Sequence, residues 1–156
     1  MSTAPFVFLD RVRWSDTDPA GIMRYDAYQR FFEVAEAELF RAAGLPPGET
    51  VLAADVWLVR KVMHVEFHSP ARLDEQVEIG VQVSRLGTTS LALDFAVRSA
   101  ESRTPRADGH LVLVAVDKET LRKRELPAEL VRKLEPFVGP SVRQSASRAS
   151  GGPTPS

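Results

Sequence analysis

The chain has 156 residues, about the size of one domain, and its 44% apolar and 26% charged residues are typical of a globular protein. Its formal net charge of −1 gives no basic surface for a polyanion, so we expect no nucleic-acid partner. The absence of cysteine excludes disulfide bonds, a cysteine nucleophile and thiolate-bound metals. Residues 1–8 lack the basic start and apolar stretch of a signal peptide, and no run approaches the roughly 20 apolar residues that cross a bilayer. We therefore expect a cytoplasmic protein with no membrane partner.

The first predicted element is a short strand followed by a turn. Residues 6–14 are assigned to the strand because, toward its end, apolar Val12 and Trp14 alternate with arginines. Residues 15–21 follow, and their Ser, Asp, Pro and Gly content is typical of a turn. This segment is too polar for the interior of a strand or a helix.

A long helix over residues 25–43 is the clearest element of the sequence. Its apolar side chains recur at the three- and four-residue spacing of one helix face, as in Tyr28, Phe31, Phe32, Ala35, Leu39 and Ala42. Asp26 and Gln29 resemble a capping box at the start of this helix. Gly44 is expected to end it.

Four strands are predicted in the remainder of the chain. They cover residues 56–67, 76–84, 91–98 and 110–116. Gly87 lies in the short link between the second and third of these, which are therefore expected to form an antiparallel hairpin. A short helix over residues 127–137 closes the domain, residues 1–138, and the polar residues 139–156 are expected to be a disordered tail. Because few helices separate the strands, the fold class is α+β, with an antiparallel sheet and the long helix on one face.

Several kinds of catalytic site are excluded by missing motifs. The sequence has no G-x-S-x-G elbow for a serine nucleophile and no glycine-rich phosphate loop. His64, Glu66 and His68 would share one face of a strand and could offer two imidazoles and a carboxylate to a metal ion. The same spacing is typical of a polar outer face, with Val65 and Phe67 in the core, and we therefore predict no metal site.

Asp16 and Asp18, in the turn before the long helix, have two interpretations. In the first, both have a purely local role: Asp16 forms an Asx turn, and residues 18–21 form a β-turn that begins at Asp18. Alternatively, Asp18 is a catalytic carboxylate, because the exposed N–H groups of a helix start can polarise a carbonyl or hold an oxyanion beside it. Such a carboxylate could attack the carbonyl or activate a water molecule. The two interpretations are compatible, since the turn can aim the side chain.

Residues 12–25, V-R-W-S-D-T-D-P-A-G-I-M-R-Y, resemble the active-site signature of 4-hydroxybenzoyl-CoA thioesterase-like enzymes of the hotdog fold. The resemblance continues through the long helix and the predicted hairpin to about residue 120. It implies a five-stranded antiparallel sheet wrapped around one long helix. It also implies an acyl-CoA substrate, most plausibly aromatic, no cofactor, and a dimer or a dimer of dimers with the active site at the dimer interface.

The resemblance assigns roles to three residues of the turn and the helix start. Asp18 corresponds to the catalytic carboxylate of the family. Tyr25 corresponds to the residue whose backbone N–H points at the thioester carbonyl, and Gly21 to the position where the backbone turns closely around the thioester. Whether the carboxylate acts as nucleophile or as general base stays open.

Five further residues are candidates for substrate binding. Glu33 matches an acidic position that could touch the acyl group, although an acidic residue early in a helix also suits the helix dipole. Trp57 could line the acyl pocket or, like most large aromatic residues of strands, belong to the core. The 4-hydroxybenzoyl-CoA thioesterases of the family carry a cluster of basic residues for the CoA phosphates at the predicted hairpin. In this sequence Arg85 is the only basic residue of the hairpin turn, and Thr88 lies close to it. Arg60 is an alternative candidate for binding the CoA phosphates.

The acyl group of the substrate is left open by the sequence. Gly48 stands where the most similar family members carry a bulky residue, so other aryl-CoA or short-to-medium acyl-CoA esters are alternatives to 4-hydroxybenzoyl-CoA. A thioesterase for acyl carrier proteins and a non-catalytic acyl-CoA-binding scaffold are the other functions we considered. A dehydratase of the same fold is less expected, because no histidine lies near the helix start in the sequence.

Overall fold

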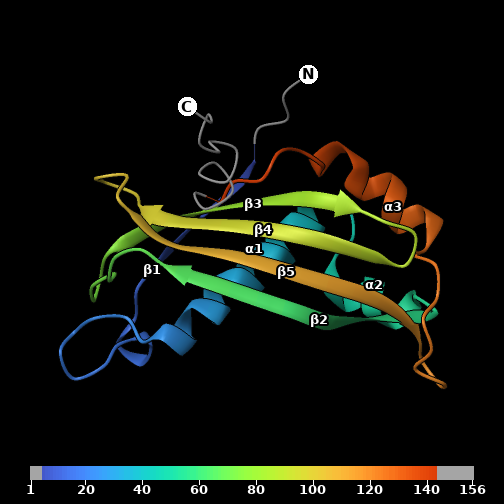
Figure 1. Ribbon diagram of the computed structural model, residues 1–156, viewed down its shortest axis with the longest axis horizontal. Helices are drawn as coiled ribbons and strands as arrows, with labels where there is room; N and C mark the ends of the chain where they lie inside the picture. The colour runs from blue at the N-terminus through green and yellow to red at the C-terminus, as the bar shows by residue number, and fades with distance from the viewer. Residues whose placement is uncertain (1–4, 144–156) are drawn as a thin grey trace, which may run out of the picture.

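Five antiparallel strands form one sheet in the computed structural model, which describes residues 5–143. Along the sheet their order is β1-β3-β4-β5-β2, and their bounds are β1 Phe6–Arg11, β2 Val56–Phe67, β3 Gln76–Leu86, β4 Ser90–Ser99 and β5 Pro105–Asp117. The long helix α1 (Tyr28–Ala42) crosses behind the sheet in Figure 1. Two short helices, α2 (Pro47–Ala53) and α3 (Ala128–Leu134), and three 3-10 turns, η1 (Trp14–Asp16), η2 (Tyr25–Ala27) and η3 (Glu135–Phe137), complete this part of the chain. The predicted α+β class and the sheet around one long helix are confirmed.

The hydrophobic core lies between α1 and one face of the sheet. Alternate residues of β3 and β4 are almost completely buried there: Val77, Ile79, Val81, Val83, Leu91, Leu93, Phe95 and Val97. The ring of Phe32 in α1 packs against Phe95, with 4.8 Å between the ring centroids. Gly109 of β5 makes room for this helix, because a Cβ atom at that position would lie 2.7 Å from the Phe32 ring.

The N-terminal strand is shorter than the predicted residues 6–14. β1 ends at Arg11, and Trp14 begins the turn η1 and is 80% exposed, so it does not share a buried face with Val12. The cause is local, because a carboxylate oxygen of Asp16 accepts the backbone N–H of Arg13 at 2.8 Å. This hydrogen bond turns the chain before a longer strand can form.

The start of the long helix also differs from the prediction. Residues 25–27 form the turn η2, and α1 itself begins at Tyr28 with Ala27 as its N-cap and no side-chain cap. The predicted capping box is therefore wrong, and Asp26 instead accepts a hydrogen bond from Arg24 Nε at 3.1 Å. Gly44 has a φ of +77°, which supports its predicted role at the end of the helix. Helix α2 was not predicted from the sequence. Pro47 lies in its first turn, where a backbone N–H would have no partner within the helix, so its absence is tolerated.

Strand β2 forms one edge of the sheet, and two of its aromatic side chains are outside the core. Trp57 is 39% exposed, with the Lys118 ammonium 4.3 Å from its ring centroid. Phe67, which we expected in the core, is 53% exposed and packs against the ring of Tyr28 at 5.5 Å. Both side chains stay exposed because an edge strand has a neighbouring strand on one side alone.

The end of the described chain contacts the sheet. The backbone N–H of Gly139 donates to the carbonyl of Val83 at 3.1 Å, and Arg143 Nε lies 3.5 Å from a carboxylate oxygen of Asp94. Residues 139–143 thus lie against β3 and β4. The rest of the predicted disordered tail, residues 144–156, lies outside the described residues.

Candidate active site

An ion-pair network holds the loop between β1 and α1 against the helix. Asp16, 3% exposed, accepts two hydrogen bonds from Arg30 of α1, at 2.9 Å from Nε and 2.5 Å from Nη2. Arg30 Nη1 also donates to Asp10 of β1 at 2.8 Å. Burial alone would raise the pKa of Asp16, but the hydrogen bonds from Arg30 and from the Arg13 backbone outweigh it and lower that pKa. Asp16 is therefore ionised and fully engaged in fixing the loop.

Asp18, two residues farther on, closes a tight turn. Its backbone N–H donates to the carbonyl of Ile22 at 2.9 Å, and its own carbonyl accepts from Gly21 at 3.0 Å. Its Oδ1 atom accepts the backbone N–H of Ala20 at 2.8 Å, an Asx-type arrangement that the sequence led us to expect at Asp16 instead. The Oδ2 atom has no hydrogen-bond partner among the described residues. The turn thus uses one carboxylate oxygen and leaves the other available for chemistry.

Gly21 serves this turn through its backbone conformation. Its φ of +77° lies in the left-handed region that glycine adopts without cost. Its carbonyl accepts the N–H of Leu73 at 3.0 Å, and Met23 N–H donates to the Ala71 carbonyl at 2.8 Å. These bonds join the loop to the segment after β2. A close approach of the Gly21 backbone to a substrate remains a prediction.

A cavity of about 680 Å³ lies between this loop, the helix start and the end of β2. It is lined by Asp18, Ile22, Met23, Arg24, Tyr25, Asp26, Tyr28, Phe67, His68, Ser69 and Pro70. Its volume is within the range of small-molecule sites, roughly 300–1,000 Å³. The backbone N–H of Tyr25, at the first position of η2, has no acceptor among the described residues. Asp18, with one carboxylate oxygen available, and Tyr25, with its backbone N–H available, therefore line the same cavity.

The other predicted substrate-binding residues lie elsewhere in the single chain. Glu33 and Arg60 line a separate cavity of about 290 Å³ farther along α1, where Arg60 Nη2 donates to Glu36 at 2.8 Å. Burial raises the pKa of Glu36, against the opposing effect of Arg60. Trp57 lines a third, smaller cavity with Phe40, of about 130 Å³. Each of the three cavities is lined by residues of both α1 and β2, at successive positions along the helix.

The predicted contacts to the CoA phosphates are at the opposite end of the sheet from Asp18. Arg85 donates to the Ser90 hydroxyl across the β3–β4 hairpin at 3.1 Å, and the Thr88 carbonyl accepts the N–H of Leu126. In Figure 1 this hairpin lies beside α3, whereas the loop that carries Asp18 is at the other end. Within one chain, Arg85 and Thr88 do not line the cavity of Asp18.

Sequence reasoning missed the segment 67–70, which forms one wall of the cavity. It also found no histidine near the helix start, but His68 is among the residues that line the cavity. Residues 67–70 reach the cavity because the backbone pairs segments that are about 50 positions apart in the chain, such as Met23 with Ala71. No local pattern in the sequence specifies that register.

Comparison with known proteins decides the family. A model of the thioesterase-like superfamily matches residues 12–134. The chain belongs to this superfamily. It is accordingly a thioester hydrolase, and it has the hotdog fold that the sequence resemblance implied. Among residues 5–143, no helix is long and apolar enough to span a membrane.

Individual members of the superfamily align over most of their length. The acyl-CoA thioester hydrolase YbgC of an Escherichia coli strain is 30% identical over 86% of this chain and 99% of its own. The 4-hydroxybenzoyl-CoA thioesterase of a Pseudomonas species is also 30% identical, over 78% of this chain and 91% of its own. The crystal structure of a 1,4-dihydroxy-2-naphthoyl-CoA thioesterase from Synechocystis superposes with a TM-score of 0.78 over 83% of this chain and 94% of its own. At 18% identity, that last similarity is evidence for the fold alone.

Proposed function

We propose that this thioesterase hydrolyses an acyl-CoA ester with an aromatic acyl group, and that Asp18 is its catalytic carboxylate. The observation that carries the proposal is the pairing of Asp18 with the N-terminal end of η2 in one cavity. The Tyr25 N–H would donate to the thioester carbonyl and stabilise the negative charge that develops on its oxygen. The similarity to a named acyl-CoA thioester hydrolase and a named 4-hydroxybenzoyl-CoA thioesterase supports the substrate class.

Two routes are open to the Asp18 carboxylate. As a nucleophile it would attack the carbonyl carbon, expel the CoA thiolate and form a mixed anhydride that water then cleaves. As a general base it would take a proton from a water molecule that attacks the carbonyl directly. In both routes the products are a free acid and CoA. The Oδ2 atom, which has no partner among the described residues, would be the reacting atom in either route.

An aromatic acyl group suits the walls of the cavity. The rings of Tyr28 and Phe67 pack edge to face at 5.5 Å and both line it. Aromatic side chains offer flat apolar surface against which an aryl ring can pack. Burial raises the pKa of Tyr28, so its hydroxyl stays protonated and can donate a hydrogen bond.

We also propose that the working enzyme is a dimer joined along β2. This edge strand exposes several large apolar side chains, namely Val59, Val62, Met63 and Phe67. A long apolar edge strand invites pairing with another chain. A second copy against β2 would lie beside the three cavities that β2 residues line and would bring partner residues to them. Light scattering after gel filtration should give a mass of two or four chains, and a monomer would contradict this part of the proposal.

The substrate class is tested by release of free thiol from a panel of esters. Benzoyl-, hydroxybenzoyl- and phenylacetyl-CoA would be compared with hexanoyl- and decanoyl-CoA, and with one acyl-carrier-protein thioester. A kcat/KM at least tenfold higher for an aryl-CoA than for the straight-chain esters is expected. Preference for the straight-chain esters would overturn the aromatic assignment, and preference for the carrier-protein thioester would overturn the CoA assignment. Binding of CoA esters without turnover would point to a scaffold.

A further inference from the structure

The three histidines of the chain gather on the sheet face that is turned away from α1. Each lies near a carboxylate: His64 is 3.3 Å from Glu66, His68 is 3.0 Å from Asp108, and His110 is 2.5 Å from Asp94. The orientation of these side chains follows from β5. Position 109 faces α1, since a Cβ atom on Gly109 would touch the Phe32 ring. The side chains of Asp108 and His110, on either side of it, therefore point away from α1. Among the described residues, the one group of three metal-ligand side chains within 4.8 Å of one another is Glu66, His68 and Asp108.

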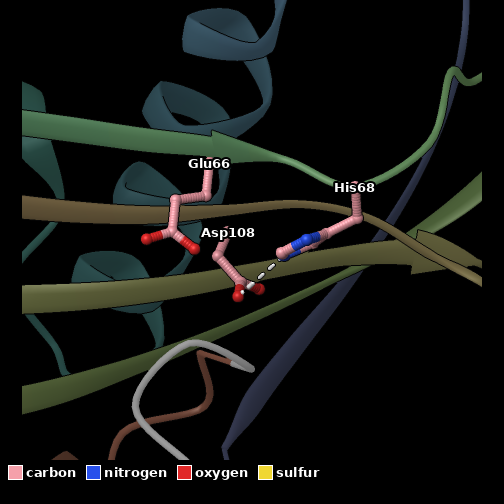
Figure 2. Close-up of side chains that lie close together, drawn as sticks. All are labelled: Glu66, His68 and Asp108. Carbon is pink, nitrogen blue, oxygen red and sulfur yellow. Dashed lines mark hydrogen bonds and ion pairs between the residues drawn. The ribbon is translucent and has the colours of Figure 1, made fainter. Parts of the chain in front are cut away.

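Backbone pairing brings these three side chains together. Glu66 of β2 and Asp108 of β5 are direct cross-strand partners, and His68 follows Glu66 by the two-residue step that returns to the same face. Figure 2 shows Glu66 on β2, His68 on the loop that follows β2 and Asp108 on the neighbouring strand, with a dashed line for the interaction between His68 and Asp108. The Asp108 side chain keeps 3% of its surface exposed and that of His68 keeps 25%.

From this geometry we propose that Glu66, His68 and Asp108 bind one divalent transition-metal ion of the Zn²⁺ type. An imidazole nitrogen with two carboxylate oxygens is a three-ligand set that Zn²⁺ accepts, with its remaining position open to water. The imidazole distinguishes the group from an acidic cluster on the surface, because it favours Zn²⁺ over Ca²⁺ or Mg²⁺.

The distances fit such an ion after one small adjustment. His68 Nε2 and the nearer Asp108 oxygen are 3.0 Å apart. If an ion lay about 2.1 Å from each of them, the angle between its two bonds would be about 90°. The ligand atoms of the whole group lie within 4.8 Å of one another, whereas two ligands of a tetrahedral ion would be about 3.4 Å apart. The Glu66 side chain is 39% exposed and has the rotatable bonds to close this difference.

The two carboxylates lie directly opposite each other on adjacent strands, and that of Asp108 is buried. A divalent cation between them would reduce the repulsion that like charges cause at such a position. Because His68 directly precedes the Ser69–Pro70 wall of the Asp18 cavity, metal binding would also fix that wall.

Titration calorimetry with ZnCl₂ on the chelator-treated, full-length protein tests this site. One ion per chain should bind, and Glu66→Gln and His68→Ala should each weaken binding at least tenfold. The matched control is His110→Ala, which removes a histidine from the same face and from a similar His–Asp pair. It should bind Zn²⁺ as the wild type does. Glu66→Gln changes an exposed side chain, so it should fold normally, and thermal unfolding with and without Zn²⁺ checks this directly.

Three outcomes would overturn the proposal. The first is unchanged Zn²⁺ binding by Glu66→Gln, which would mean that Glu66 is not a ligand of the ion. The second is equal weakening by His110→Ala, which would show nonspecific binding to histidine. The third is no binding by the wild type at millimolar ZnCl₂. None of these results depends on the proposed thioesterase chemistry, because the readouts are heat and unfolding temperature rather than turnover.

Discussion

Asp16→Asn should destabilise the protein strongly although the substitution is nearly isosteric. The carboxylate is 3% exposed and accepts hydrogen bonds from Arg30 Nε, Arg30 Nη2 and the Arg13 backbone. Asparagine has one acceptor oxygen and no charge, so it cannot satisfy both guanidinium donors.

The size of this loss of stability depends on how much of the Arg30 guanidinium is left without a partner. Removing one partner of a buried ion pair costs about 3–5 kcal/mol. Arg30 keeps 24% of its side-chain surface exposed and retains Asp10 as a partner, so we expect a smaller loss than this range, about 2–3 kcal/mol. For a chain of this size that corresponds to a fall in Tm of roughly 5–10 °C.

The assay is urea denaturation at pH 7, with Asp26→Asn as the matched control. Asp26 forms an exposed ion pair with Arg24 in the same part of the chain, so its loss should cost under about 0.5 kcal/mol. Equal, small losses for both variants would refute the role assigned to Asp16 as the residue that holds the loop to α1.

Two further predictions concern the same scaffold. Because the pKa of Asp16 is lowered by folding, its stabilising contribution is present above its unfolded pKa and is lost as the pH falls through the lower folded value. Wild type should therefore lose stability below about pH 4 more steeply than Asp16→Asn in pH-dependent denaturation, and parallel curves would contradict this. Gly109→Ala would place a Cβ atom 2.7 Å from the Phe32 ring, and overpacking of this kind costs about 1–3 kcal/mol. Gly80→Ala is its control, since a Cβ atom there would meet nothing nearer than 3.9 Å, and equal costs for the two would count against the packing argument.

The elements with a strong local pattern could be predicted from the sequence. The alternation in β3 and β4 and the helical spacing of α1 each reflect one buried face, and the structure confirms all three elements. The same reasoning misplaced Trp14 and Phe67, because their exposure depends on where a strand ends and which strand forms the sheet edge. Neither property is encoded in the period of the pattern.

The candidate site was predictable in part for the same reason. Asp18 and Tyr25 are seven residues apart in the chain, so a local motif contains both. The cavity wall at residues 67–70 and the pairing of Glu66 with Asp108 depend on the register between distant segments. Composition and period carry no information on that register, and the structure was needed to find these contacts.

The most direct test of the account is thiol release by Asp18→Asn against the wild type, with the best ester of the panel. Asparagine preserves the turn, since its side-chain oxygen can accept the Ala20 N–H as the Oδ1 atom does now. The free energy of unfolding should therefore change by less than about 0.5 kcal/mol, the usual limit for a surface substitution, and thermal unfolding of the two proteins checks this. The account predicts that kcat falls on the order of 10²-fold or more, the scale of a lost acid–base group. Equal turnover by the two proteins would contradict it and would place the chemistry at a different residue.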